Sequence, residues 1–376
     1  MSETARGQVS RPTLFERYAL DRLEAGDLET LRLILRGGSV IDWKRLHFKT
    51  RGEVDHFLRT NLFDPDDPID VRRMREILRQ AVEYLRKTFR YRVAEPVAKP
   101  RGIQDLFLLA SGVLEPTRLR RIACVVLKVM HTVQHVEARE LLHRARVSEV
   151  EIAQMVDHRV RGVVERLVRE ERLPIVEFDG SAKSRHSVVT KLIAKRENVA
   201  AQVYDRHRYR VVVEDLASVV TVVLVLAHEM FPFNYVVPGQ AQNTLVSLSE
   251  LGRAHPRLRE LARAHPDGSE DDGLRQSNEF SGRSYRILNF IVDLPLRIDA
   301  TALATKHERD DDLGRIVFAP VELQVVDKLT AHANEEGENA HVRYKKRQLR
   351  QVLSRLSRGL VVPRRRKAEP DGNGAG

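Results

Sequence analysis

The pattern of apolar and polar positions changes near residue 147. From about 13 to 145, apolar residues recur at three-to-four spacing in segments such as DVRRMREILRQAVEYLRKTF and LRRIACVVLKVMHTVQHVEARELLHRA. This spacing places the apolar side chains on one helix face, so it predicts helix almost throughout. The breakers in AEPVAKPRG, residues 94–102, divide this region into two helical groups.

From about 147 to 350, predicted helices alternate with strands. The amphipathic helix VSEVEIAQMVDHRVRGVVERLVREE is followed by a strand PIVEF, a loop DGSAKSRH, a helix SVVTKLIAKREN, a strand RYRVVVE and an apolar helix at 215–230. The strands YRILNFIVDLPLRI and RIVFAPVELQVV and one final polar helix complete the region. Residues 239–280 are too many for an ordinary loop and predict a partly helical insertion. The order predicts an α/β or α+β layer covered by helices.

The ends and the cysteine content indicate a cytoplasmic protein. Residues 1–12 and 363–376 carry little apolar content and predict disordered tails. The single cysteine, Cys124, excludes an internal disulfide framework, and the N-terminus has no apolar signal core. The longest apolar run, residues 216–227, is shorter than the roughly 20 residues that a membrane-spanning helix needs. We therefore expect no membrane association.

Charge favours polyanionic partners. The formal net charge is +11 and the pI is near 9.9, which suits binding to nucleotides or RNA. The basic segment RYKKRQLRQVLSRLSRGLVVPRRRK, which ends the last helix and continues into the tail, is either a solvated face or an RNA or ribosome contact. His131, His135 and His143 lie on one predicted helix, where we favour structural roles over metal binding, and Cys124 lies on an apolar helix and predicts a core residue.

The segment APVELQVV places a carboxylate within a strand. Successive strand residues point to opposite faces, so Glu322 and Gln324 share one face while Val321, Leu323 and Val325 share the other. A lone carboxylate beside apolar neighbours is costly unless it faces a cleft, a cation or a partner. Glu322 is therefore a candidate metal ligand or general base.

A second candidate site is the segment GSAKSRHSVVTK. Lys183, Ser187 and Lys191 follow one another at four-residue steps where a loop enters a helix. A helix N-terminus favours anions, and residues one turn apart share a face. The segment is either a phosphate cradle or a solvated basic helix start.

Two more segments carry candidate ligands. Asp205 precedes a strand that contains Arg210, and this carboxylate either holds Mg²⁺ beside phosphate-binding guanidiniums or joins a surface salt-bridge cluster. Tyr285 opens a later strand near Arg286 and Asn289. Its ring either stacks on a purine or packs against a neighbouring helix.

Together these segments resemble the RelA/SpoT-type nucleotidyltransferase domain, the (p)ppGpp synthetase fold. The last signature of that family runs E-x-Q-x-R-T and then A-E-x-G-x-A-A-H-W-x-Y-K, and the residues that match it in register are Glu322, Gln324, Glu335, Gly337, Ala340, His341, Tyr344 and Lys345. Its phosphate loop is matched by Gly180, Lys183, Ser187 and Lys191, and two shorter motifs by Asp205, Arg210, Tyr285 and Arg286. The resemblance covers roughly residues 147–350.

The chain departs from the family pattern at four positions. The arginine of the phosphate loop is Ser181, for which Arg185 or Arg206 is a substitute, and the arginine of E-x-Q-x-R-T is Val326. A histidine is replaced by Asn289, and the tryptophan before the last Tyr-Lys pair by Val342. These positions bear on the adenine and acceptor pockets.

The resemblance implies an α+β fold, with a mixed β-sheet nucleotidyltransferase domain flanked by helices and preceded by an all-helical N-terminal region of unknown role. It implies that Asp205 and Glu322 hold Mg²⁺, that Glu322 or Gln324 lies close to the acceptor hydroxyl, and that Tyr285 stacks on guanine. The remaining nucleotide-binding residues would be Lys183, Arg185, Ser187, Lys191, Arg210, Arg286, His341 and Lys345.

The function that the resemblance implies is Mg²⁺-dependent transfer of pyrophosphate from ATP to the 3′-hydroxyl of a guanine nucleotide, as in guanosine tetraphosphate metabolism and the stringent response. Transfer to another acceptor, such as tRNA, is one alternative. A catalytically silent protein of the same fold that binds nucleotide or RNA is another.

Overall fold

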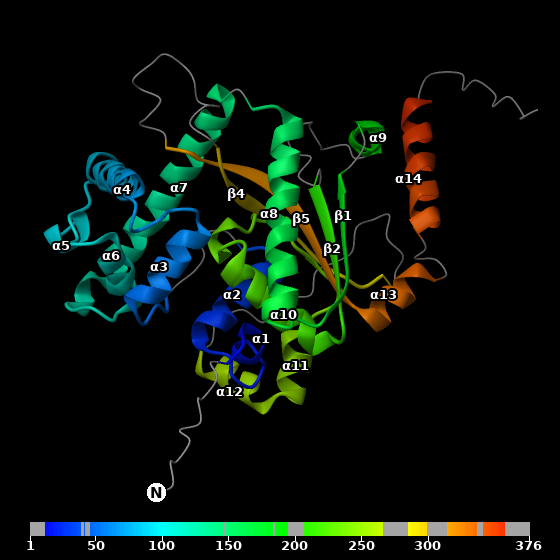
Figure 1. The fold of residues 1–376 in the computed structure, drawn as a ribbon, viewed down its shortest axis with the longest axis horizontal. Helices are drawn as coiled ribbons and strands as arrows, with labels where there is room; N and C mark the ends of the chain where they lie inside the picture. The colour runs from blue at the N-terminus through cyan, green and yellow to red at the C-terminus, as the bar shows by residue number, and fades with distance from the viewer. Residues whose placement is uncertain are drawn as a thin grey trace, which may run out of the picture.

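The structure, a computed structural model, describes residues 12–38, 41, 46–145, 147–182, 185–194, 207–265, 285–298, 314–336 and 341–357 of the 376-residue chain. It has the predicted α+β fold, in which helices flank a five-stranded mixed sheet (Figure 1). Among the described residues, no helix combines the length and the apolar character needed to cross a bilayer.

The first part of the chain is helical, as predicted. Its helices are α1 (Leu14–Arg17), α2 (Ala25–Arg36), α3 (Arg51–Thr60), α4 (Pro68–Phe89), α5 (Glu95–Ala98), α6 (Ile103–Ser111) and α7 (Arg120–Arg144), with a short 3-10 helix, η1 (Thr117–Leu119). Helix α4 begins where Asp67 caps the Ile69 amide and Pro68 occupies the first turn.

The second part alternates helices and strands. Its elements are α8 (Glu149–Glu170), β1 (Ile175–Ala182), α9 (Arg185–Ala194), β2 (His207–Val213), α10 (Leu216–Glu229), η3 (Phe233–Tyr235), β3 (Gln242–Asn243), α11 (Leu248–Ala254), α12 (Pro256–Ala264), β4 (Leu288–Arg297), β5 (Ile316–Asp327), α13 (Lys328–Glu335) and α14 (His341–Leu356). Ser148 and Glu151 form the capping box that starts α8.

Several boundaries differ from the prediction. Strand β4 begins at Leu288, so Tyr285, the predicted start of this strand, precedes it. The segment from Asp179 to Ala182, predicted as loop, continues β1, because β1 pairs with β2 as far as the Ala182–His207 pair. The single predicted final helix consists of two helices, α13 and α14, with residues 337–340 outside the described residues. The predicted insertion contains β3, α11 and α12.

The strand order in the sheet is β1-β2-β5-β4-β3. Strand β2 pairs in parallel with β5, and the other neighbours are antiparallel. The β2–β5 pairing joins segments more than a hundred residues apart in sequence, so no local pattern predicts it.

Two hydrophobic cores hold the chain together. The first joins one face of the sheet to α2, α8 and α10 and includes Val211, Leu323 and Val325. The second lies among α3, α4, α6 and α7 and includes Cys124, which is buried as predicted. Helix α2 thus packs on the sheet although it belongs to the predicted helical N-terminal region.

The helices of the second core cover one end of the other sheet face. Ile316, at the start of β5, belongs to the second core, and the His135 ring of α7 stacks on Phe318 with 4.4 Å between centroids. Arg297 of β4 donates from both terminal nitrogens to the two oxygens of Asp70 of α4, each at 2.8 Å. The opposite end of this face carries the residues described below.

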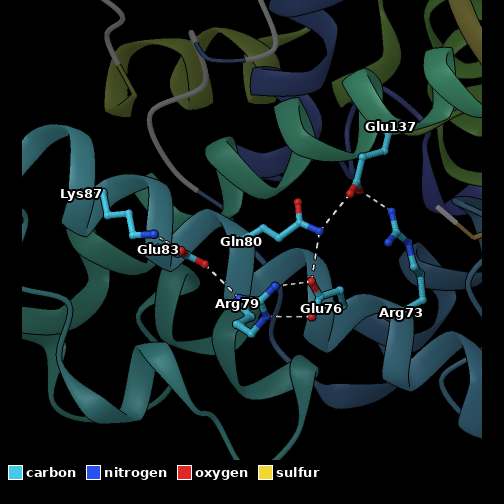
Figure 2. Close-up of polar contacts among 7 residues, drawn as sticks. All are labelled: Arg73, Glu76, Arg79, Gln80, Glu83, Lys87 and Glu137. Atoms are coloured by element: carbon cyan, nitrogen blue, oxygen red, sulfur yellow. Dashed lines mark hydrogen bonds and ion pairs between the residues drawn. The ribbon is translucent and has the colours of Figure 1, made fainter. Parts of the chain in front are cut away.

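Polar contacts tie α4 to α7 within the helical group (Figure 2). Glu137 of α7 accepts hydrogen bonds from Arg73 and Gln80 of α4. Gln80 also donates to Glu76, which joins Arg79, Glu83 and Lys87 in a chain of ion pairs along α4. Because Arg73 and Glu137 are both largely buried, this contact fixes the helix pair more strongly than the exposed pairs do.

Candidate active site on the polar face of the sheet

Strand pairing brings polar side chains of four strands into two rows on one sheet face. Residues that pair directly across neighbouring strands point to the same face. The first row runs Ser181, Arg208, Glu322 and Ile291, from β1 to β4, and the second runs Asp179, Arg210, Gln324 and Asn289. We call these eight residues the polar rows.

Glu322 lies at the centre of the polar rows. It is only 4% exposed, and a carboxylate so deeply buried needs strong partners. Arg208 Nε donates to its Oε2 at 2.8 Å. Its Oε1 accepts from Asn289 Nδ2 at 2.8 Å and from Gln324 Nε2 at 3.1 Å. Glu322 is therefore held by one cation and two amides on three strands.

The Asn289 amide leaves one polar atom without a partner. Because its Nδ2 donates to Glu322, its Oδ1 must point elsewhere. This oxygen is buried, and it has no hydrogen-bond partner in the part of the chain that the structure describes. Buried polar atoms are nearly always paired, so an orphaned oxygen beside a buried carboxylate indicates a place for a donor or a cation.

The entrance to β4 is fixed from α13. Asn334, which is buried, accepts from the Arg286 amide at 3.1 Å and donates to the Arg286 carbonyl at 2.6 Å. One residue earlier, Tyr285 lies within electrostatic range of Arg210, Arg208 and Glu322. Burial raises the pKa of Tyr285, so its phenol stays neutral and can donate a hydrogen bond at neutral pH.

Arg210 lies at the rim of the polar rows. Its Nη1 donates to Oε1 of Glu335 in α13 at 3.1 Å, and the side chain of Glu335 is 67% exposed. An ion pair this exposed contributes little stability and exchanges readily with other anions. Arg210 is therefore available to a phosphate.

The chain matches no protein-family model and no curated protein. The solved structures to which it is similar include the following three, each at 13% sequence identity. Small alarmone synthetase 1 of Bacillus subtilis aligns over 60% of this chain and 87% of its own with a TM-score of 0.28, and synthetase 2 of the same organism over 59% and 98% with a TM-score of 0.30. A GTP pyrophosphokinase family protein of Streptococcus pneumoniae aligns over 55% and 84% with a TM-score of 0.29. At such low TM-scores, the site residues alone carry the functional proposal.

Several predicted site residues come together in this region. Glu322 and Gln324 are in contact, and Arg210, Tyr285 and Arg286 lie around them. Ser187 and Lys345 are exposed on α9 and α14, two helices that lie side by side (Figure 1). Lys183 and Asp205 lie outside the described residues, as do the side chains of Arg185, Lys191 and His341 within α9 and α14.

Sequence reasoning did not predict two contacts of the site. It did not pair Arg208 with Glu322, and it placed Asn289 near Tyr285 and as a departure from the family pattern without a contact to Glu322. The alternation of side chains along β2 and β4 predicts which residues of the same strand share a face. Only the pairing of β2, β5 and β4 brings both residues to Glu322.

The structure also gives physical reasons for two departures. Val326, at the position of a family arginine, is 1% exposed and belongs to the first core, where a charged side chain would be costly. Ser181 is exposed and pairs with Arg208 across the sheet. Arg208 therefore brings a guanidinium to the row in which the family arginine is missing.

The histidines of α7 form no group of three metal-ligand side chains within the described residues. His131 and His135 are buried enough that the pKa of His131 falls well below its usual value and that of His135 falls to about 4, which keeps both rings neutral. His135 Nδ1 lies 3.9 Å from Asp293, whose pKa burial raises to about 6.

The described residues hold one such group, formed by His56, His228 and Glu229. Its two imidazole rings are stacked 4.0 Å apart at 18°. Their nitrogen lone pairs therefore run side by side and do not converge on one ion. Arg166 Nη2 also forms an ion pair with Glu229 Oε2 at 2.7 Å, so we interpret the group as an ion-pair cluster.

Proposed function

We propose that this protein is a Mg²⁺-dependent nucleotide pyrophosphokinase that transfers pyrophosphate from ATP to the 3′-hydroxyl of a guanine nucleotide. The observation that carries the proposal is the buried Glu322, held by the Arg208 guanidinium and by the amides of Asn289 and Gln324 on one sheet face. The family resemblance of the E-x-Q segment supports the same assignment. A purely structural role for Glu322 would not explain why the neighbouring Asn289 keeps a buried oxygen that no described residue pairs with.

The chemistry of the transfer suits these residue types. The acceptor oxygen attacks the β-phosphorus of ATP and forms a new O–P bond. The bond between that phosphorus and the bridging oxygen of the α-phosphate breaks, and AMP leaves. The hydroxyl proton passes to Glu322, which acts as general base. Gln324 and Asn289 hold the carboxylate in one orientation for that step.

The two arginines contribute charge to the phosphates. Arg208 and Arg210 extend from β2 on the same face, two residues apart. When a triphosphate enters, Arg208 exchanges its contact with Glu322 for a phosphate oxygen, which frees the carboxylate to accept a proton. Arg210 exchanges its contact with Glu335 for a phosphate oxygen in the same way. Preorganised cations of this kind stabilise charge that develops in a transition state.

The residues present fit a magnesium ion in part. Mg²⁺ prefers oxygen ligands, and the orphaned Oδ1 of Asn289 lies on the side chain that already contacts Glu322. With the Asn289 amide turned so that Oδ1 faces Glu322, these two side chains and Asp205 would hold the ion, which when bound would neutralise charge on the triphosphate. To bind the ion, the Glu322 carboxylate must give up its contact with Arg208.

Tyr285 and the Arg286 backbone would position the acceptor. Burial keeps the Tyr285 phenol neutral, so its ring and hydroxyl offer stacking and one donor without a charge. The contacts of Asn334 to Arg286 hold this segment at the edge of the site. Positioning of the hydroxyl is worth a large part of the rate in reactions of this type.

A second candidate function is nucleotide binding without transfer. The observation in its favour is the ion pair between Arg208 and Glu322, which satisfies the carboxylate without a metal. A protein that uses this state permanently would bind phosphates through Arg210 and leave Glu322 inactive.

The decisive experiment follows γ-labelled ATP with Mg²⁺ and one acceptor at a time: GDP, GTP, AMP or bulk tRNA. Labelled products are resolved by thin-layer chromatography. Glu322→Gln is the test variant, and Glu214→Gln is its matched control, because Glu214 is half exposed and pairs with Lys328 at the far end of β2. Transfer by the wild type and by Glu214→Gln, lost in Glu322→Gln, is the expected result.

Absence of transfer to every acceptor, in protein that is folded and binds ATP, would favour the binding protein. Transfer to tRNA alone would keep the site and change the acceptor.

A further inference from the structure

A cluster of exposed aromatic side chains lies where α4 ends. Tyr84, Phe89 and Tyr91 are 47%, 58% and 47% exposed. The rings of Tyr84 and Phe89 meet edge to face with 5.6 Å between centroids. Tyr84 and Phe89 therefore form a small exposed aromatic platform, and Tyr91 follows two residues later in the chain. α4 lies at the outer edge of the molecule (Figure 1).

Cationic side chains surround this platform. Between residues 84 and 101 there are six cationic residues and one acidic residue: Arg86, Lys87, Arg90, Arg92, Lys99 and Arg101 against Glu95. Lys87 is committed to Glu83, as Figure 2 shows, and Lys99 to Glu95 at 2.9 Å. Arg90, Arg92 and Arg101 are exposed, and no acidic side chain of the described residues pairs with them.

Arg90 ends α4 in the left-handed region, at φ 54° and ψ 30°. Glycine adopts this conformation more readily than arginine does. Leu62 and Arg172 also have positive φ, so the backbone at Arg90 bears on the choice of variants below and not on the assignment of binding.

We propose that the C-terminal end of α4, with Tyr84, Phe89, Arg90, Tyr91 and Arg92, binds single-stranded nucleic acid. Bases stack on exposed aromatic rings, and guanidiniums contact the phosphates between them. Unpaired arginines around flat rings match both parts of such a strand. An acidic peptide would use the cations but has no planar groups to place on three rings. The proposal is independent of the chemistry on the sheet.

The test uses the full chain and a fluorescein-labelled single-stranded RNA of about twelve nucleotides, a length suited to one small binding surface. Fluorescence anisotropy gives the dissociation constant at several salt concentrations between about 50 and 200 mM. A hairpin duplex and polyglutamate serve as competitors.

Three variants make the test specific. Phe89→Leu keeps an apolar side chain but removes the ring, and should weaken single-strand binding about tenfold, since stacking is worth about 1–3 kcal/mol per base. Arg90→Gly removes one cation and should reduce the slope of log affinity against log salt by about 0.7. Arg75→Gln is the matched control, because Arg75 is exposed on the same helix, away from the rings, and it should leave affinity unchanged.

The Arg90→Gly variant also distinguishes an effect on folding from an effect on RNA binding. Glycine relieves the left-handed backbone, so this variant should melt no lower than the wild type while it binds less RNA.

Three results would overturn the proposal. The first is no RNA binding at low salt, and the second is an equal loss of affinity in Arg75→Gln. The third is competition by polyglutamate as effective as that by unlabelled RNA, with no effect of Phe89→Leu, which would assign the surface to an acidic protein.

Discussion

Two buried carboxylates, each paired with a half-buried arginine, lie at opposite ends of one sheet face, and they differ in what surrounds them. At one end, Arg297 contacts both oxygens of Asp70, and the helices of the second core cover the pair. At the other end, Arg208 contacts Glu322 beside the orphaned oxygen of Asn289. We call the first the clamp pair and the second the site pair. In the first pair both carboxylate oxygens meet one guanidinium, which suits a structural contact; in the second an unpaired amide oxygen lies beside the carboxylate, which suits the catalytic role proposed above.

The comparison also explains why helices precede the sheet. α4 and α7 cover the face at Arg297, Ile316 and Phe318, and they leave the end that carries Glu322 and Gln324, where we propose the active site.

The largest expected effect on stability is at the clamp pair. Arg297→Met leaves the buried Asp70 without its cation, which should lower the free energy of unfolding by about 3 kcal/mol. We take the low end of the usual range because Arg297 is 34% exposed. Denaturant unfolding measures it, with Arg315→Met as control for loss of one surface charge. A loss under about 1 kcal/mol would remove the distinction between the two pairs.

At the site pair we expect a smaller loss of stability and a larger loss of activity than at the clamp pair. Arg208→Met leaves Glu322 two amide donors, so we expect a loss of about 1–2 kcal/mol in stability. Pyrophosphate transfer should fall by at least about tenfold, because one phosphate-binding cation is gone. Arg297→Met should therefore cause the larger loss in the unfolding assay, and Arg208→Met the larger loss in the transfer assay. Equal rank in both assays would contradict the assignment of roles.

Asn289→Asp sharpens the comparison through metal dependence. The substitution places a second carboxylate against Glu322, and like charges at this distance repel. The melting temperature should fall without Mg²⁺ and should recover by several degrees when Mg²⁺ is added. Differential scanning fluorimetry across a Mg²⁺ titration measures this. A melting curve that does not respond to Mg²⁺ would argue against oxygen ligands at this place.

The smallest effect is expected at the ion-pair cluster of His56, His228 and Glu229, which links α3 to α10. Contact with Glu229 raises the pKa of His56 above 6.5. Its contribution to stability is therefore full below pH 6.5 and disappears as pH rises through the folded value. The partners of Glu229 lower its pKa, so its own contribution is lost as pH falls below about 4.5. The contribution of His56 makes stability fall as pH rises between about 5.5 and 8.5, so His56→Gln should shift the slope of stability against pH in the positive direction, and an unchanged slope would contradict it.

Local patterns predicted the elements well and the site in part. The alternation of Val321 to Val325 gave the correct faces of β5, and helical spacing gave α4, α7 and α8. The segment around Gly180 misled, because glycine and serine read as loop where pairing with β2 extends the strand.

The contacts of Glu322 lay beyond sequence reasoning. Arg208 is 114 residues from Glu322 and Asn289 is 33 residues away, so both contacts depend on the order of the strands. The orphaned atom of Asn289 follows from hydrogen-bond geometry, which has no counterpart in the sequence. The clamp pair escaped notice for the same reason, since Asp70 and Arg297 lie in different halves of the chain.

The most direct test of the account is the rate of pyrophosphate transfer by Glu322→Gln at saturating ATP, Mg²⁺ and acceptor, with ATP affinity measured on the same preparation. Glutamine keeps the shape of the side chain and can still meet the neighbouring amides after reorientation, but it accepts no proton. The account predicts a loss of about 10² or more in the rate, as for removal of a general base, with ATP affinity changed by only a few-fold. Transfer at the wild-type rate would contradict the central role of Glu322.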